Sequence, residues 1–428
     1  MKRRHFLTTA AALAAAGQLA EAQRAESNAA TPVSAPAINA LKSRRSEAKP
    51  ITTAERRDRI ARAQQLMQQN KIDAVCMAGG TSLAYFTGIR WGNSERLFAF
   101  VLPQNGRPFY VSPAFEEDRA REQISQAPDG DSCRVLTWQE DENPYALVAK
   151  GLQDAGVKTG RIGIEERTTF VFSDGIGKAS PAAQIVSATP VTAGCRMMKS
   201  PAELALMRLA AEVSLAAYEA AWKSLQPGMT QNQFGALVAA AHRQLGFTGE
   251  ASIQAGEYSA LPHGSRTPQT IREGTVLLMD GGCSVEGYQS DISRTFVLGK
   301  ATDEMKRVFE IVHRAQTAAL KTARPGLPAG DVDAAARKVI TDAGYGPGYK
   351  YFTHRVGHGM GMDGHEWPYL VKGNPLPLQA DMTFSDEPGI YIRGEFGVRL
   401  EDDMHITENG AELFTPQSPS PEEPFARA

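Results

Sequence analysis

Apolar residues repeat at helical spacing near the start of the main body of the chain. Ile60, Ala63 and Met67 fall on one face of a helix with 3.6 residues per turn. Thr52 and Glu55 precede them with the spacing of a capping box, in which both side chains bind free N–H groups of the first turn. The pattern therefore predicts a helix that begins directly after Thr52.

The sequence after this helix alternates short apolar runs with helix signals. Asn105-Gly106 lies between two apolar runs and is a dipeptide that tight hairpin turns favour. Asn143-Pro144 combines a capping residue with a proline suited to the first helical position. No cluster of nucleophiles or ligands accompanies these elements, so we expect a small structural α/β domain over residues 51–187. Its predicted strands are 74–78, 97–102, 109–111 and 162–164, and its second helix ends near Gly156.

The C-terminal half shows a helix pair followed by strand patterns, twice. Residues 200–203 (Ser-Pro-Ala-Glu) start one helix with a capping box, and Thr230 with Gln233 starts the next. The recurrence favours two related lobes in a catalytic domain over residues 188–415, followed by a loose tail over 416–428. The expected helices are 200–226, 230–246, 302–323 and 331–343, and the expected strands are 276–283, 288–298 and others up to about 407.

The first 22 residues have the composition of an export signal. Lys2, Arg3 and Arg4 precede a weakly apolar stretch that ends in the cleavage-type sequence Ala20-Glu21-Ala22. The adjacent arginines resemble a twin-arginine signal, which directs folded proteins to the periplasm. The alternative is the frayed basic start of an alanine-rich helix. We expect a flexible linker over residues 23–50 and no stable membrane anchor after cleavage.

Composition narrows the class of protein further. The chain has 428 residues, of which 42% are hydrophobic, enough for a large core. Its 46 basic and 48 acidic residues give a net charge of −2, so we expect no nucleic-acid partner. The four cysteines are scattered without the paired spacing of a zinc ribbon or redox pair. These features are typical of a globular protein, and the helix and strand patterns described above predict the mixed α/β (α+β) class.

Two aspartates face each other across the hairpin predicted at residues 276–298. If residues 286–287 form the turn, Gly282 pairs with Asp291, and Asp280 lies diagonal to Asp291 on the same face. Diagonal positions are roughly 7–8 Å apart, which allows two carboxylates to share metal ions. Cys283 falls on the opposite face and is assigned to core packing. Such a pair alone is also compatible with solvated surface carboxylates.

A second group of candidate ligands follows in HRVGHGMGMDGHE, which contains His354, His358 and His365. Glu387 and Glu401 come after it in SDEPGIY and GVRLED. A lone histidine is usually structural, but three within twelve residues among glycines favour a site. Carboxylates with one imidazole suit Mn²⁺, Co²⁺, Fe²⁺ or Zn²⁺. The G-x-G-x-x-G at residues 359–364 is not read as a nucleotide motif, because no βαβ unit surrounds it.

Four blocks of this region resemble the pita-bread metallopeptidases, a family that includes Xaa-Pro aminopeptidase, prolidase and methionine aminopeptidase. The blocks are MDGGCSVEGYQSDISRTF, HRVGHGMGMDGHE, EPGIYI and GVRLED, in the family's order and spacing. DAVCMAGGTSLAYFTG and RMMKSPAE resemble the N-terminal domain of the creatinase and prolidase branch. The resemblance covers about residues 53–415 and implies a creatinase-type N-terminal domain before a two-lobed pita-bread domain around a dinuclear metal site.

The resemblance also implies a role for each candidate ligand. Asp280 would bind one metal ion, His358 and Glu387 the other, and Asp291 with Glu401 would bridge them. Two neighbouring ions lower the pKa of a bridging water and polarise the substrate carbonyl, so that a bridging hydroxide attacks. We expect two divalent ions per chain, with manganese first and cobalt, iron or zinc as alternatives.

Further residues are implied for proton transfer and substrate binding. Glu387 would be the proton shuttle, His263 and His365 would stabilise the tetrahedral intermediate, and His354 would shape the substrate pocket. HEWPYLVKG lacks the arginine that some prolidases carry soon after this histidine for the free carboxylate of a dipeptide. Lys372 or Arg399 could supply that charge instead.

Three classes of function remain open at this stage. The first is a periplasmic Xaa-Pro aminopeptidase or dipeptidase, which we expect to be a homodimer acting on small peptides. The second is a lyase or hydrolase of a small non-peptide molecule, such as dimethylsulfoniopropionate or an ectoine, on the same scaffold. The third is a metal-free binding protein, which the intact ligand set disfavours. The metal ligands do not separate the first two, because the substrate pocket determines specificity.

Overall fold

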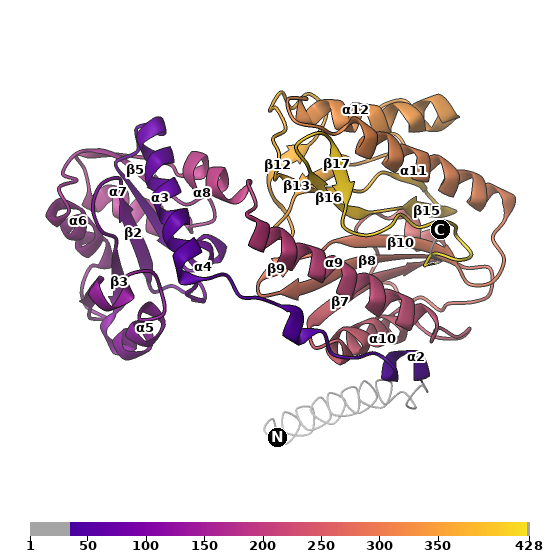
Figure 1. The fold of residues 1–428 in the computed structure, drawn as a ribbon, viewed down its shortest axis with the longest axis horizontal. Coiled ribbons are helices and arrows are strands. Elements are labelled where there is room, and N and C mark those ends of the chain that lie inside the picture. The colour runs from indigo at the N-terminus through magenta and orange to yellow at the C-terminus, as the bar shows by residue number, and fades with distance from the viewer. Residues whose placement is uncertain (1–34, 426–428) are drawn as a thin grey trace, which may run out of the picture.

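A computed structural model describes residues 35–425 and shows two domains side by side (Figure 1). The predicted export signal and the first part of the predicted linker lie outside these residues. None of the described helices is both long and apolar enough to cross a membrane.

The N-terminal domain is built around a six-stranded mixed sheet with the order β4-β3-β2-β1-β5-β6. The β2–β3 hairpin is antiparallel, as the Asn105-Gly106 turn predicts, and β1 pairs in parallel with β5. Thr52 and Asn143 cap their helices as predicted. The strands are β1 Ala74–Ala78, β2 Ala99–Pro103, β3 Phe109–Pro113, β4 Arg134–Trp138, β5 Gly160–Ile164 and β6 Ala183–Ser187. The helices are α3 Thr53–Asn70, α4 Thr81–Thr87, α5 Glu117–Ile124, α6 Pro144–Asp154, α7 Phe170–Ala179 and α8 Thr189–Arg196.

This domain extends beyond the boundary that we expected at residue 187. Helix α8 follows β6 and contributes Val191 and Cys195 to the same apolar cluster as Met67 of α3. A helix whose apolar face packs against the core of the preceding domain belongs to that domain. The N-terminal domain therefore includes α8.

The catalytic domain contains two helix pairs, each with its own apolar core against strands. Helices α9 Pro201–Trp222 and α10 Gln231–Gln244 both start with complete capping boxes. In Figure 1 the pairs α9–α10 and α11–α12 lie on the outside, and the strands lie between them. The first lobe adds β7 Thr248–Ala255, β8 Val276–Val285, β9 Tyr288–Gln289 and β10 Ile292–Val297. The second has α11 Asp303–Thr322, α12 Ala329–Ile340, β11 Gly357–Gly359, β12 Glu366–Leu370, β13 Thr383–Asp386, β14 Gly389–Ile392, β15 Phe396–Arg399, β16 Asp402–Ile406 and β17 Ala411–Leu413.

The hairpin that carries the two aspartates turns where the sequence predicts. Val285 pairs with Tyr288, and the two residues between them, Glu286 and Gly287, have φ values of 52° and 94°. Two left-handed residues in a row are the geometry of a tight hairpin turn. Cys283 is buried on the other face, where its thiol donates to the carbonyl of Ala210.

Two segments that we expected to be flexible are instead packed. Within the predicted linker, Ile38 is buried in the core of the first lobe, and the Arg44 N–H donates to the carbonyl of Leu245. Within the predicted loose tail, the Pro421 carbonyl accepts from the N–H of Val297. Sparse apolar residues and many prolines suggested disorder, but a few apolar anchors and backbone hydrogen bonds hold both segments on the catalytic domain.

Candidate metal centre

Five side chains from different strands and strand ends converge in the catalytic domain. His358 Nε2 lies 3.3 Å from Glu387 Oε1 and 3.8 Å from Asp291 Oδ2. These five residues and the neighbouring His365 form three overlapping sets of three. Within each set, the possible ligand atoms lie within 4.8 Å of one another. The structure therefore brings together the residues that the sequence singles out as ligands: Asp280, Asp291, His358, Glu387 and Glu401.

The register of the hairpin explains how the two aspartates meet. Gly281 pairs with Ile292 and Asp280 with Ser293, so that Asp291 lies one position beyond the paired strand and diagonal to Asp280. This is the register that the sequence predicts. A slip of one residue would turn every side chain of the strand to the other face, so the register determines whether the two carboxylates share a site.

His358 is held in the form that binds metal. Its Nδ1 lies 3.1 Å from the carbonyl oxygen of Gly359, which only accepts, so Nδ1 carries the proton and Nε2 presents a lone pair to the carboxylates. The backbone N–H of His358 donates to Ser385 Oγ, which fixes the strand locally. Burial, and then the neighbouring His365, lower the pKa of His358 to about 3. The imidazole is therefore neutral at physiological pH.

The carboxylates of this cluster are placed where they repel one another. Burial raises the pKa of Asp291 and of Glu401 well above the ordinary range, and neighbouring carboxylates raise both further. Burial also raises the pKa of Glu387 to about 7, although Arg399 opposes the shift. Without cations, such a site must hold protons. The donor set, four carboxylates and one neutral imidazole, fits divalent cations that displace those protons.

Arg399 and Ser293 contact the candidate ligands directly. Arg399 Nη2 lies 2.5 Å from Asp280 Oδ2, and its Nε donates to Ser293 Oγ. The Ser293 hydroxyl lies 2.8 Å from Asp280 Oδ1 and 2.5 Å from Glu401 Oε2. Arg399 is thus engaged by a candidate ligand, which differs from the expectation that it could bind the substrate carboxylate. Sequence reasoning missed Ser293, although the hairpin register places it directly opposite Asp280.

The other three candidate histidines differ in burial and in their contacts with the cluster. His354 is half-buried; its Nδ1 donates to the Arg355 carbonyl and its Nε2 accepts from the Tyr391 hydroxyl at 2.7 Å. His365 is exposed, with its ring 3.9 Å from that of His358. His263 lies in an exposed loop between the η4 turn (Gly256–Ala260) and β8. The structure thus places His365 directly beside the cluster and His354 within 3.8 Å of a carboxylate oxygen of Glu387.

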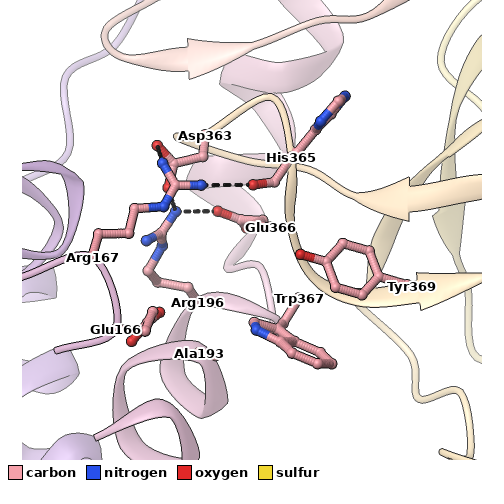
Figure 2. Close-up of a pocket in the computed structure, with 9 residues that line it drawn as sticks. All are labelled: Glu166, Arg167, Ala193, Arg196, Asp363, His365, Glu366, Trp367 and Tyr369. Carbon is pink, nitrogen blue, oxygen red and sulfur yellow. Dashed lines mark hydrogen bonds and ion pairs between the residues drawn. The ribbon is translucent and has the colours of Figure 1, made fainter. Parts of the chain in front are cut away.

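The segment that carries His365 is bound by the N-terminal domain and by the residues that follow its last helix, α8. Arg196 of α8 pairs with Asp363 at 2.5 Å and also with Glu366, and Lys199 pairs with Glu366 at 2.7 Å. Figure 2 shows Arg196 together with Arg167, which donates to the His365 carbonyl. The cavity between the domains measures about 200 Å³. The blocks RMMKSPAE and HRVGHGMGMDGHE, which lie more than 150 residues apart in the sequence, therefore meet at this cavity.

Comparisons with known proteins agree with this architecture. Residues 205–408 match metallopeptidase family M24, and residues 59–198 match the creatinase/prolidase N-terminal domain. A Xaa-Pro dipeptidase of Lactobacillus delbrueckii subsp. lactis is 33% identical over 365 residues, which are 83% of this chain and 96% of the relative. A probable dipeptidase PepE of Mycobacterium tuberculosis is 36% identical over 339 residues, 78% of this chain and 87% of the relative.

Solved structures show the same fold. Dipeptidase PepE from Mycobacterium ulcerans aligns with a TM-score of 0.80 and 33% identity, and the alignment covers 86% of this chain and 97% of the PepE chain. Prolidase from Thermococcus sibiricus aligns with a TM-score of 0.76 and 30% identity, and the alignment covers 84% of this chain and 96% of the prolidase chain. The two domains and the carboxylate–histidine cluster thus define a metallohydrolase of the pita-bread type. The chain belongs to metallopeptidase family M24, in its creatinase/prolidase branch, as the resemblance of its sequence blocks implies.

Proposed function

We propose that the protein is a dinuclear metal-dependent peptidase that cleaves the bond before proline in Xaa-Pro dipeptides or short Xaa-Pro peptides. The observation that carries this proposal is the partly buried cluster of four carboxylates around a neutral imidazole, in a chain that belongs to metallopeptidase family M24. Relatives of nearly the same length are named Xaa-Pro dipeptidase and prolidase, which supports the substrate class.

Within the cluster, Asp280 would hold one ion, and His358 with Glu387 would hold the second. Asp291, which lies diagonal to Asp280, and Glu401 would be shared between the two ions. When bound, two divalent ions lower the pKa of a water between them and polarise the scissile carbonyl. We take manganese as the first candidate and cobalt, iron and zinc as alternatives.

The surrounding side chains then act on the substrate. Glu387 would be the group that moves a proton, because its carboxylate lies beside His358, 3.3 Å from Nε2, and a carboxylate there could take a proton from the attacking water and pass it to the leaving amine. His365, next to His358, and His263, in the loop before β8, would donate to the charge that develops on the carbonyl oxygen. His354, which is hydrogen-bonded to Tyr391 and has its Nδ1 3.8 Å from Glu387 Oε2, would shape the pocket.

We also propose a location, on the basis of the first residues alone. The arginine pair and the alanine-rich stretch of residues 1–22 favour export in a folded state to the periplasm. A route for folded proteins is suited to a metalloenzyme that acquires its ions before export.

A substrate panel tests the activity. The mature chain is stripped of metal, reloaded with Mn²⁺, and assayed with Ala-Pro, Ala-Pro-Ala and Ala-Ala, with dimethylsulfoniopropionate as the non-peptide arm. We expect release of alanine from a proline-containing peptide and a rate lower by about 100-fold or more with Ala-Ala, because the pocket loses the ring contacts. Turnover of the non-peptide alone, with no peptide cleaved, would refute the proposal.

A further inference from the structure

One arginine beside the candidate metal centre has no acidic partner. Arg355 is half-buried, and among the described residues no carboxylate oxygen lies within 4.0 Å of its guanidinium. Every other arginine or lysine discussed at this site has such a partner: Arg167 pairs with Asp363, Arg196 and Lys199 pair with Glu366, and Arg399 pairs with Asp280. A half-buried cation without an anion is a candidate for binding an anionic group of a ligand.

The position of Arg355 is set by an aromatic ring on the neighbouring strand. Its guanidinium carbon lies 4.1 Å from the centre of the Tyr369 ring, a cation–π contact. Tyr369 on β12 pairs directly with His358 on β11, so both side chains project from the same face of the sheet. Tyr369 also lines the interdomain cavity together with His365 (Figure 2). The charge of Arg355 therefore lies at the junction of the metal cluster and this cavity.

Electrostatic effects on the cluster agree with this placement. Burial is the largest cause of the lowered pKa of His365, and the charge of Arg355 is the second largest. The same charge also contributes to the lowered pKa of His358. It also opposes the rise in the pKa of Glu387. Arg355 is therefore near enough to His358, Glu387 and the neighbouring His365 to act on them electrostatically.

We infer that Arg355 binds the free α-carboxylate of the prolyl residue, and that this contact makes the enzyme prefer dipeptides over longer peptides. This inference rests on the proposed function. An extended residue spans about 3.3–3.6 Å, so the carboxylate of a dipeptide lies only one residue beyond the scissile bond. The planar fork of an arginine matches a carboxylate through two hydrogen bonds. The Tyr369 ring packs against the guanidinium, and HEWPYLVKG contains no arginine of its own.

The experiment compares an acid with its amide on the metal-loaded mature chain. Ala-Pro and Ala-prolinamide are assayed with wild type, Arg355→Met and Arg355→Lys, and binding of L-proline and L-prolinamide is measured by calorimetry. In Arg355→Met we expect kcat/KM for Ala-Pro to fall roughly 10- to 100-fold, the range for a charge-assisted hydrogen bond, while Ala-prolinamide changes less than about threefold. L-Proline binding should weaken by a similar factor, and Arg355→Lys should recover part of both losses.

Two further variants separate the alternatives. Arg119→Met removes another guanidinium that lies over an aromatic ring, 4.3 Å from Trp91 in the N-terminal domain, and should leave the acid-to-amide ratio unchanged. Lys372→Gln removes the exposed lysine that the sequence offered as a carboxylate partner; a collapse of the ratio there would overturn the inference. An unchanged acid-to-amide ratio in Arg355→Met would overturn the inference as well. A loss of kcat/KM confined to Asp-Pro, with Ala-Pro unaffected, would also overturn it, because Arg355 would then bind the side chain of the first residue. If folded, metal-loaded wild type cleaves neither acid nor amide, the proposed function itself has failed.

Discussion

The buried ion pairs between the domains make Glu366 a sensitive position for stability. Glu366, Lys199 and Arg196 are 7%, 4% and 4% exposed, and the Glu366–Lys199 contact is 2.7 Å long. Glu366→Gln leaves Lys199 without any anion, while Arg196 keeps Asp363. Removing one partner of a buried pair costs about 3–5 kcal/mol, and the retained pair of Arg196 favours the lower end, about 3 kcal/mol. That loss is a large fraction of the roughly 5–15 kcal/mol by which folded proteins are stable.

Urea unfolding of wild type and Glu366→Gln at pH 7 measures this cost. The control is Asp174→Asn, which breaks a Lys178–Asp174 pair of the same 2.7 Å length on the surface and should cost about 0.5 kcal/mol. The double variant Lys199→Met with Glu366→Gln should be more stable than Glu366→Gln alone, because it removes the unpaired buried cation. A cost below about 1 kcal/mol for Glu366→Gln, with wild-type cooperativity, would refute the reasoning.

The pH dependence of this cost follows from the pKa of Glu366. Burial alone would raise that pKa, but the charges of Lys199 and Arg196 outweigh burial and lower it below the ordinary 4.5. A carboxylate with a lowered folded-state pKa stabilises the fold fully above its unfolded pKa, and loses that contribution as pH falls through the folded value. The difference between wild type and Glu366→Gln should therefore be constant above about pH 5 and shrink in stronger acid. A difference that grows in acid would contradict this assignment.

Three further predictions concern the metal centre and export. Binding of Mn²⁺ to the stripped protein at pH 7 should release protons, because the pKa of Glu387 in the metal-free site is about 7 and a bound cation displaces its proton. Calorimetry in two buffers of different ionisation enthalpy checks this, and no buffer dependence would contradict it. Asp291→Asn should lose tightly held metal by elemental analysis, whereas His354→Ala should keep it and mainly lower kcat/KM; the reverse pattern would show that ligand and pocket roles are assigned wrongly. Residues 1–50 fused to a reporter that is active only after export in a folded state should lose export when Arg3 and Arg4 become lysine, and undiminished export would argue against the twin-arginine route.

The local signals of the sequence determined much of the fold. Capping residues such as Ser200 and Thr230 start their helices as predicted, because the first turn is satisfied by side chains only a few residues away. The turn at residues 286–287 set the hairpin register, and the register alone brought Asp280 and Asp291 together. These features depend on chain geometry over about ten residues, which the order of residues specifies directly.

Only the tertiary structure decided which distant residues meet. Few apolar residues occur in 35–50 and 416–425. The contacts that hold these segments are made with residues more than a hundred positions away, as in the backbone hydrogen bond from Arg44 to Leu245. Arg399 could be assigned to Asp280 rather than to substrate only when β8 and β15 were placed in space. Arg355 stood out only after every other cation of the site proved to be paired. Charge pairing between remote segments depends on distances of a few ångströms, because both Coulomb attraction and desolvation change steeply over that range, and no sequence pattern contains those distances.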